Sequence, residues 1–489
     1  MFAVNRWVFR LVVPLLVAAL GVLALSSGAQ AAGESEIDAR WTALGGASGV
    51  LGPKLSPPDD VPHDVVGVPG ASAQDFATGS IFWSEATGAW DVRGAILDAY
   101  LAIGGPAGSL GLPSAAPAPV TTESGQSQAF TGGHIYWSAA TGAHPLQGPV
   151  LARYVALGGP DSTLGLPRSG ETSVTGGTRT EFQGGHIYWS TAGGARVVAG
   201  AILARYLAEG GSGVLGMPTT DEISAAPGGR ATIFTRGRIY WSAATGARAI
   251  KGAILARYLA VGGARSYLGF PETSEYAFGS ARRNRFVNGW ITAYPGKTPV
   301  VVGKWRPAVQ RVTAAEIPYT YRSGCPVGPA SLRRVKMPYY NWSGIPRWGD
   351  LIVRTSAADD MQRVFKRAFS ARFNIRQIRP VDVWRGSDIA SMKADNTSAF
   401  NCRKVTGNPY RLSQHSYGNA IDINTAENPY VTSSRVYPAG SRTYLNRRNV
   451  RKGMIVASGP IARGMRAEGW PWGARWSHPD YQHFSANGG

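Results

Sequence analysis

The chain repeats itself, and this feature restricts its fold more than any other. The nine-residue segment Gly-Ala-Ile-Leu-Ala-Arg-Tyr-Leu-Ala occurs at residues 200–208 and again at 252–260. Variants begin at Gly94 and Gly148, and a fainter one covers residues 37–43. Each segment is followed by a Gly-Gly pair and then by a Leu-Gly-x-Pro element. The last four of these elements are spaced by 54, 51 and 53 residues. The pattern predicts five repeats of one structural unit.

Each unit, within residues 32–303, is predicted to hold one short helix and a small hairpin. Ile202 and Tyr206 recur at helical spacing, and Gly210 follows as a helix-ending glycine. Residues 180–198 alternate instead in short runs separated by glycines, which is typical of strands joined by tight turns. One helix and one hairpin cannot bury their own apolar faces. The units are therefore expected to pack on one another, in a ring or in a stack.

The repeats resemble the LGFP repeat family, whose signature stands unaltered at residues 268–271. The resemblance implies that they hold an exported protein to cell-wall polysaccharide. Each unit also carries an aromatic pair such as Tyr188-Trp189, and sugar rings stack on aromatic faces. The alternative is that these rings belong to the core, and for each individual pair we favour the core, since strand aromatics usually point partly inward.

The N-terminus has the pattern of a secretory signal peptide over residues 1–31. Arg6 and Arg10 form a basic start, residues 11–25 are uncharged and apolar, and Ala-Gln-Ala at 29–31 is a small-x-small cleavage signal. An apolar run of this length is short of the roughly 20 residues that a membrane-spanning helix needs. We expect a secreted, wall-associated protein without a stable membrane span. An uncleaved anchor is the alternative.

The charge of the chain is concentrated in its C-terminal part. Residues 304–489 carry 29 Lys and Arg against 11 Asp and Glu, which accounts for +18 of the total of +20. Such a surface attracts anionic partners. Nucleic acid would fit the charge, but the export signal argues against it, whereas an anionic cell wall fits both. With 44% hydrophobic and 16% charged residues, the chain is also too apolar to be disordered.

Beyond a short linker at residues 304–320, the pattern predicts an α+β domain over 321–489. Apolar residues at helical spacing after a capping box at 356–359 predict a helix over about 357–370. Residues 373–383 alternate more like a strand.

The chain has two cysteines, Cys325 and Cys402. Because disulfides form in exported proteins, we interpret them as one disulfide that closes a loop of about 77 residues. Two buried free thiols are the alternative.

Chemistry-bearing residues gather near the C-terminus. The motif Ser-x-His-x-x-Gly-x-Ala-x-Asp places His415 and Asp422 seven residues apart, with Gly418 permitting a tight turn between them. Further on, Asp480 precedes His483 by three residues. Two imidazoles and one carboxylate can hold one Zn²⁺ per chain and leave a position open for water. The remaining carboxylate could act as a base. A metal-free relic or a purely structural metal is the alternative.

This motif, followed downstream by an acidic residue three before a histidine, resembles the VanY-type D-alanyl-D-alanine carboxypeptidase family of zinc metallopeptidases. The resemblance covers roughly residues 318–484. It implies zinc ligands at His415, Asp422 and His483. It also implies that Asp480 is the general base, although the family often has the longer Glu at this position.

Amide hydrolysis builds an oxyanion, and a further positive group should stabilise it or bind the substrate carboxylate. Arg403 is the expected residue, because it lies next to Cys402 and so beside the predicted disulfide. Arg385 is the second candidate. His478 does not fit the family spacing, and Ser413 is expected to orient the site by hydrogen bonding.

The sequence thus predicts a secreted zinc peptidase that hydrolyses peptidoglycan stem peptides and is tethered to wall polysaccharide by its repeats. Two alternatives remain at this point. One is a non-catalytic wall-binding or scaffolding protein, and the other is a peptidoglycan endopeptidase of the same family, which would cut a different bond of the stem peptide or cross-bridge.

Overall fold

The computed structural model describes residues 23–55, 63–120, 124–405 and 408–488. Most of the predicted signal peptide lies outside these residues. Contacts divide the chain into two compact units, one ending at Asp221 and the other beginning at Glu222. Among the described residues, none of the helices is both long enough and apolar enough to span a membrane.

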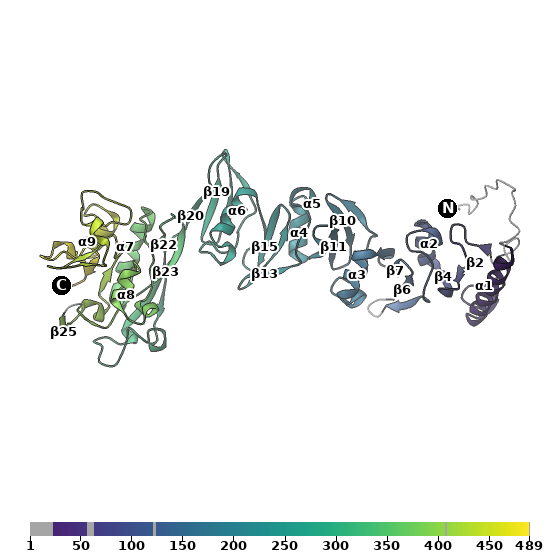
Figure 1. The fold of residues 1–489 in the computed structure, drawn as a ribbon, viewed down its shortest axis with the longest axis horizontal. Coiled ribbons are helices and arrows are strands. Elements are labelled where there is room, and N and C mark those ends of the chain that lie inside the picture. Colours follow the sequence, from purple (N-terminus) through teal and green to yellow (C-terminus); the bar gives the residue numbers. More distant parts are fainter. Residues whose placement is uncertain (1–22, 56–62, 121–123, 406–407, 489) are drawn as a thin grey trace. The chain divides into compact units, whose positions relative to one another are not determined.

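The first unit alternates helices with four-stranded antiparallel sheets (Figure 1). Its helices are α1 (Leu23–Ala43), α2 (Gly94–Ala102), α3 (Gly148–Ala156), α4 (Gly200–Ala208) and the short α5 (Gly211–Val214). Its first sheet holds β1 (His63–Asp64), β2 (Ala71–Phe76), β3 (Gly79–Ser84) and β4 (Gly88–Arg93). The second holds β5 (Ala118–Val120), β6 (Gly125–Phe130), β7 (Gly133–Ser138) and β8 (Gly142–Gln147), and the third β9 (Thr172–Val174), β10 (Gly177–Glu181), β11 (Gly185–Ser190) and β12 (Gly194–Ala199).

The strands of each repeat form a four-stranded meander, which is more than the small hairpin expected from the sequence. Neighbours in the chain are neighbours in each sheet, because glycine-containing turns separate all the strands of a repeat. Helices α2 and α3 each contact two successive sheets: α3, for example, contacts β7 and β8 of one sheet and β11 and β12 of the next. Its buried face carries Val150 and Tyr154. The expectation that each repeat buries its apolar face against a neighbour is confirmed within this unit.

In α2, α3 and α4, one tyrosine ties the helix to the Leu-Gly-x-Pro element that follows it in the chain. Its hydroxyl donates to the glycine carbonyl, from Tyr100 to Gly111 at 2.6 Å and from Tyr154 to Gly165 at 2.7 Å. The ring of Tyr154 also meets that of Tyr136 edge-on, with centroids 5.3 Å apart. The tyrosines of the Tyr-Trp pairs are buried, as expected for core residues, whereas tryptophans such as Trp137 stay partly exposed.

The second unit begins with two more meanders and one more repeat helix, α6 (Gly252–Ala260). The first meander is β13 (Ile223–Ala226), β14 (Gly229–Phe234), β15 (Gly237–Ser242) and β16 (Gly246–Lys251). The second is β17 (Tyr276–Phe278), β18 (Ala281–Phe286), β19 (Gly289–Ala293) and β20 (Val300–Gly303).

The rest of the second unit is the C-terminal domain (Figure 1). Its largest sheet is β21 (Ala308–Arg311), β22 (Leu332–Tyr340) and β23 (Pro346–Arg354). Its helices are α7 (Ala358–Ser370), α8 (Asp388–Lys393) and α9 (Pro460–Ala467). Its two-stranded ladders pair β24 (Lys404–Val405) with β25 (Asn408–Leu412), β26 (Ala420–Asp422) with β29 (His483–Ser485), and β27 (Tyr430–Val431) with β28 (Val436–Tyr437).

Helix α7 forms the centre of the core of this domain. It packs on β22 and on α9 and buries Met361, Val364 and Phe365 with Val335 and Leu351 of the sheet. The helix predicted over about 357–370 is confirmed. The predicted capping box is wrong, because residues 355–357 form a 3₁₀ turn and the N-cap has no side-chain hydrogen bond.

The strand-like pattern at residues 373–383 does not correspond to a strand. The segment makes single bridges, Asn374 to Tyr340 and Ile378 to Thr397, and then enters a 3₁₀ turn at Val381–Trp384. Its apolar pattern arises because Ile375 and Ile378 point into the core from an irregular backbone. The disulfide between Cys325 and Cys402 is present in the structure, as predicted.

Candidate active site

His415 lies on a single 3₁₀ turn, η9 (Gln414–Tyr417), that begins and ends with defined caps. The Ser413 hydroxyl accepts a hydrogen bond from the His415 backbone N–H at 3.3 Å. Gly418 ends the turn with φ of 68°, and a Cβ there would come within 2.7 Å of the Arg354 nitrogen. The turn therefore requires glycine at this position, and it buries the imidazole to 4% exposure.

Asp422 and His483 meet across a short antiparallel ladder, although they lie far apart in the chain. Strand β26 pairs with β29, and Asp422 lies directly opposite His483 in the register. Side chains of directly opposed residues point to the same face of a ladder. The ladder therefore brings the carboxylate and the imidazole together, with Oδ1 and Nδ1 3.0 Å apart.

The three side chains form one buried group. Asp422 Oδ2 lies 3.1 Å from His415 Nε2, and the two imidazoles approach to 3.3 Å between His415 Nε2 and His483 Nδ1. One donor atom from each of the three residues lies within 4.8 Å of the others. His415 Nδ1 is 2.5 Å from the Ala399 carbonyl and donates to it, which leaves Nε2 as a lone-pair donor.

The electrostatics of this group favour an ionised carboxylate. Burial alone would raise the pKa of Asp422, but the two imidazoles outweigh it and hold that pKa well below its usual range. Burial would lower the pKa of His415, but the Asp422 carboxylate outweighs it and raises that pKa. Imidazole nitrogens with one carboxylate are a donor set that suits zinc. The residues present therefore fit the metal that the motif predicts.

Asp480 lines the same cavity but has different surroundings. It is 9% exposed, and its buried Oδ1 has no hydrogen-bond partner among the residues that the structure describes. Burial, and then the charge of Asp422, raise its pKa to about 7. A buried oxygen without a partner and a pKa near neutrality are properties of a group that can exchange a proton.

The cavity has a volume of about 150 Å³ and contains more than the predicted residues. It is also lined by residues to which no sequence pattern points, namely Asp388, Met392, Arg411, Tyr430, Trp476 and Gln482. Trp476 is the closest of the aromatic ones to a predicted ligand, with its ring 5.3 Å from that of His483. These residues are scattered over about ninety positions without a motif, so nothing in the sequence marked them.

Arg403 lines the cavity, as expected, but it is also ion-paired. Its guanidinium lies 2.9 Å from the Asp388 carboxylate. Its backbone is held by the Ser416 hydroxyl, which accepts from the Arg403 N–H at 3.0 Å and donates to the Arg403 carbonyl at 2.8 Å. The second candidate, Arg385, is exposed and does not line the cavity, and neither does the exposed His478.

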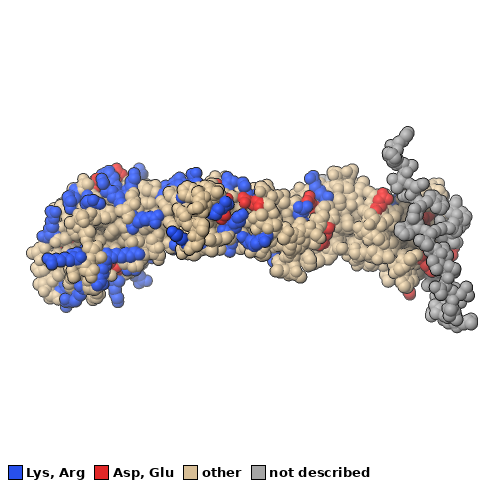
Figure 2. All heavy atoms as spheres, turned by 90° about the horizontal axis from the view of Figure 1, so that it is seen from above, with Lys and Arg blue, Asp and Glu red and all other residues tan. Residues whose placement is uncertain are grey.

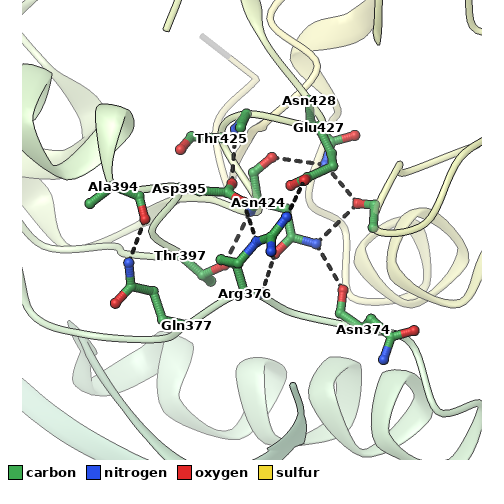
Figure 3. Close-up of polar contacts among 12 residues, drawn as sticks. Asn374, Arg376, Gln377, Ala394, Asp395, Thr397, Asn424, Thr425, Glu427 and Asn428 are labelled. Carbon is green, nitrogen blue, oxygen red and sulfur yellow. Dashed lines mark hydrogen bonds and ion pairs between the residues drawn. The ribbon is translucent and has the colours of Figure 1, made fainter. Parts of the chain in front are cut away.

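The chain that follows Asp422 is anchored by a buried polar cluster (Figure 3). The Asn424 side chain accepts from the Arg376 N–H at 3.0 Å and donates to the carbonyls of Asn374 and Gly453. Arg376 extends between two carboxylates and pairs with Asp395 at 3.0 Å and with Glu427 at 3.1 Å (Figure 3).

Glu427 of this polar cluster is 1% exposed, and within the described part of the chain its Oε2 has no hydrogen-bond partner. Burial, and then a hydrogen bond with the Asp395 carboxylate, raise its pKa to about 8. The polar cluster fixes the backbone on the C-terminal side of Asp422, and the β26–β29 ladder fixes Asp422 itself.

Comparison with protein families agrees with both resemblances. Residues 406–486 match the family model described as D-alanyl-D-alanine carboxypeptidase, and this span includes the three predicted ligands and Asp480. The LGFP repeat model matches residues 63–108, 110–162, 164–213 and 215–266. Among curated proteins, none matches the chain. Along the chain, four matches to the LGFP repeat model are therefore followed by one match to the D-alanyl-D-alanine carboxypeptidase model.

Proposed function

We propose that the C-terminal domain, residues 321–489, is a zinc-dependent peptidase that hydrolyses peptidoglycan stem peptides. The observation that carries this proposal is the buried group of His415, Asp422 and His483, with Asp480 in the same cavity. A buried carboxylate between two imidazoles serves no packing purpose, and its position within the match to a peptidase family supports a catalytic role.

His415 Nε2, His483 Nδ1 and an Asp422 oxygen would hold the metal. Zinc bound there polarises a water and the scissile carbonyl, and it lowers the pKa of the water. The protein's own contribution is to present the donors in fixed positions. The Ala399 carbonyl orients His415, and the β26–β29 ladder places Asp422 opposite His483.

Asp480 is the proposed general base. Its carboxylate takes a proton from the water that attacks the amide carbon, and it returns that proton to the nitrogen as the C–N bond breaks. One product then ends in a carboxylate and the other in an amine. The burial and the raised pKa of Asp480 suit both steps, since the group can hold the proton between them.

Arg403 is the proposed binding group for negative charge on the substrate. Its guanidinium lies in the wall of the cavity, where it pairs with Asp388 at 2.9 Å and donates from Nη1 to the Lys404 carbonyl at 3.0 Å. It could bind the substrate carboxylate or the oxyanion that develops during hydrolysis. Its fixed backbone beside the disulfide supports a positioning role of this kind.

We also propose that the chain is exported by its N-terminal signal and is held at the cell wall by residues 32–303. The predicted linker at 304–320 is only partly a connection, because its β21 belongs to the sheet of the C-terminal domain. The LGFP matches support the association with the wall. Lys and Arg side chains are spread over the visible surface of the C-terminal domain (Figure 2), and they would add a salt-sensitive attraction to an anionic wall.

Digestion of purified peptidoglycan by the full chain tests the peptidase proposal. The zinc-loaded protein should release stem-peptide fragments that mass spectrometry identifies, and His415→Ala should release none. Loss of a single terminal D-alanine would establish a carboxypeptidase. Release of cross-linked fragments would establish an endopeptidase. A wild-type protein that binds zinc and the wall but releases nothing would instead establish the scaffolding alternative.

A further inference from the structure

The C-terminal domain has a second cavity that shares no lining residue with the first. It lies between the β22–β23 hairpin and the segment 374–379 and has a volume of about 460 Å³. Three arginines line it, namely Arg347, Arg376 and Arg379, against one carboxylate, Asp350. We propose that this cavity binds an acidic sugar, meaning a sugar unit that carries a carboxylate or a phosphate.

Arg379 presents its charge from a rigid backbone. Asn396 holds this backbone from both sides, since its side chain accepts from the Arg379 N–H at 3.1 Å and donates to the Arg379 carbonyl at 2.9 Å. The Arg379 side chain itself is exposed. Among the described residues, no hydrogen bond or ion pair engages its guanidinium. A fixed backbone with an available guanidinium is suited to bidentate binding of an anion.

Arg347 faces the same space and is held at one end only. Its Nη1 donates to the Val261 carbonyl at 2.9 Å, which orients the guanidinium and leaves further N–H donors. The cations also act on the buried phenol of Tyr339. Burial raises the pKa of Tyr339, and the charges of Arg379 and Arg347 oppose this effect. Both guanidinium groups therefore lie close to one side of the cavity.

Arg376 is part of the wall of the cavity and is not available as a free cation. It is paired with Asp395 and Glu427 (Figure 3). Its guanidinium also lies 3.7 Å from the ring centroid of Trp342. Gln377 next to it donates its side-chain amide to the Ala394 carbonyl, and the amide oxygen remains as an acceptor. This wall is preorganised, so binding requires little ordering of side chains.

The remaining lining residues favour a sugar over a simple anion. Trp348 is partly exposed and lies at the same cavity as Asn341 and Asp350. The ring of Trp348 is also contacted by Tyr267, with centroids 4.7 Å apart, and by Lys336 Nζ at 5.2 Å, so its remaining exposed part offers apolar surface to a sugar ring. The carboxylate and amide oxygens beside it can accept hydroxyl protons of the sugar. A site for a bare phosphate would gain nothing from Asp350, which would repel it. The combination of two available arginines with one carboxylate therefore matches a ligand that has both hydroxyls and one negative group.

Titration of the full chain with small probes at low ionic strength tests this proposal. Calorimetry with glucuronic acid and with glucose 6-phosphate distinguishes a carboxylate sugar from a phosphate sugar, and glucose and inorganic phosphate test the two halves of the ligand. At least one acidic sugar should bind about tenfold more tightly than either half, the scale of one charge-assisted hydrogen bond. Equal binding of inorganic phosphate and both acidic sugars would overturn the proposal.

Variants distinguish binding in the second cavity from nonspecific attraction to the basic surface of the domain. Arg379→Gln and Arg347→Gln should each weaken acidic-sugar binding about tenfold. Arg448→Gln, which removes an exposed arginine outside both cavities, should change it less than twofold. If Arg379→Gln and Arg448→Gln lose equal amounts of acidic-sugar affinity, the sugar is attracted by the whole basic surface. This result would overturn the proposed site.

The binding test does not depend on peptidase activity. Asp480→Asn should bind the acidic sugar as the wild type does, because the two cavities share no residue. A chain that binds the acidic sugar but hydrolyses nothing would contradict the proposed function alone. Loss of sugar binding in Asp480→Asn would contradict the independence of the second cavity.

Discussion

Asp422 and Asp480 are two buried carboxylates in one cavity, and their different partners predict different effects of substitution. Replacing His415, Asp422 or His483 by Ala should abolish activity and stoichiometric zinc together, since a three-ligand site loses most of its affinity with one ligand gone. Asp480→Asn should keep zinc and lower hydrolysis by roughly 10²-fold or more, the scale of a lost general base. Metal analysis and hydrolysis rates measure the two effects.

The outcomes of these substitutions discriminate between the two roles. If Asp480→Asn loses zinc while Asp422→Asn keeps it, the roles of the two carboxylates are reversed. If neither substitution affects hydrolysis, the active site lies elsewhere.

The raised pKa of Glu427 predicts that the stability of the folded chain depends on pH. Its pKa is raised from 4.5 to about 8 in the folded chain, so the folded state binds this proton more tightly than the unfolded state. The stability that the proton adds is complete below pH 4.5 and is lost as the pH rises to about 8. Glu427→Gln cannot lose a proton, and its amide can still donate to Asp395. The melting temperature of Glu427→Gln minus that of wild type should therefore increase as the pH is raised from 5.5 to 8.5.

The difference between the two melting temperatures reports the titration of the Glu427 carboxyl, because wild type and Glu427→Gln share every other titrating residue. A difference in melting temperature that stays constant over this pH range would show that Glu427 does not titrate there.

At the scale of one element, helices α2, α3, α4 and α6 are each held by one tyrosine hydroxyl. Tyr154→Phe removes the hydrogen bond to the Gly165 carbonyl and keeps the ring in the core. A bond of this kind contributes about 1 kcal/mol, so local opening should become about fivefold more frequent. Hydrogen-exchange mass spectrometry of the peptide that covers α3 measures this, with β2–β4 as the internal control. Equal acceleration in both regions would show that the repeats open together and not singly.

The disulfide ties two loops of the C-terminal domain to each other. The Cys402 N–H donates to the Thr320 carbonyl at 3.0 Å, and the Arg322 guanidinium donates to the Cys402 carbonyl at 2.7 Å. The exported protein should show no thiol reactive to labelling before reduction and two after it. Removing the disulfide should cost roughly 2–5 kcal/mol of stability. Two thiols that react without reductant would contradict the bond.

Sequence patterns predicted elements well where one face of an element is buried against a regular neighbour. The helix at α7 is an example, since its apolar residues at helical spacing all pack on one sheet and one helix. The pattern failed at residues 373–383, where Ile375 and Ile378 anchor an irregular segment to the core. Alternation reports which side chains are buried, but it does not report whether the backbone groups find partners in a ladder.

For the whole molecule, the division of charge predicts two kinds of wall binding. Residues 32–221 belong to a unit that is compact through its own contacts, and they carry LGFP matches without the basic domain. This fragment should sediment with purified cell walls and stay bound in high salt. The full chain should bind more tightly at low salt only, because screening removes the attraction of its basic domain. A fragment that stays soluble, beside a full chain released by salt, would assign wall binding to the basic domain.

The sequence alone predicted the presence of repeats, the disulfide, and four residues of the candidate site, namely His415, Asp422, Asp480 and His483. Each of these follows from a periodic or local pattern: a recurring segment of nine residues, a single pair of cysteines, and a histidine and an aspartate around Gly418. Such patterns are visible because the residues that matter are close in the chain or occur again at a fixed interval.

Only the tertiary structure decided what surrounds these residues. It placed Asp388 against Arg403, left Asp480 Oδ1 without a partner, and built the second cavity from a hairpin and a distant loop. The physical reason is that ion pairing, desolvation and cavity shape depend on distances in space between residues far apart in the chain. No spacing along the sequence encodes those distances, so they become known only when the chain is folded.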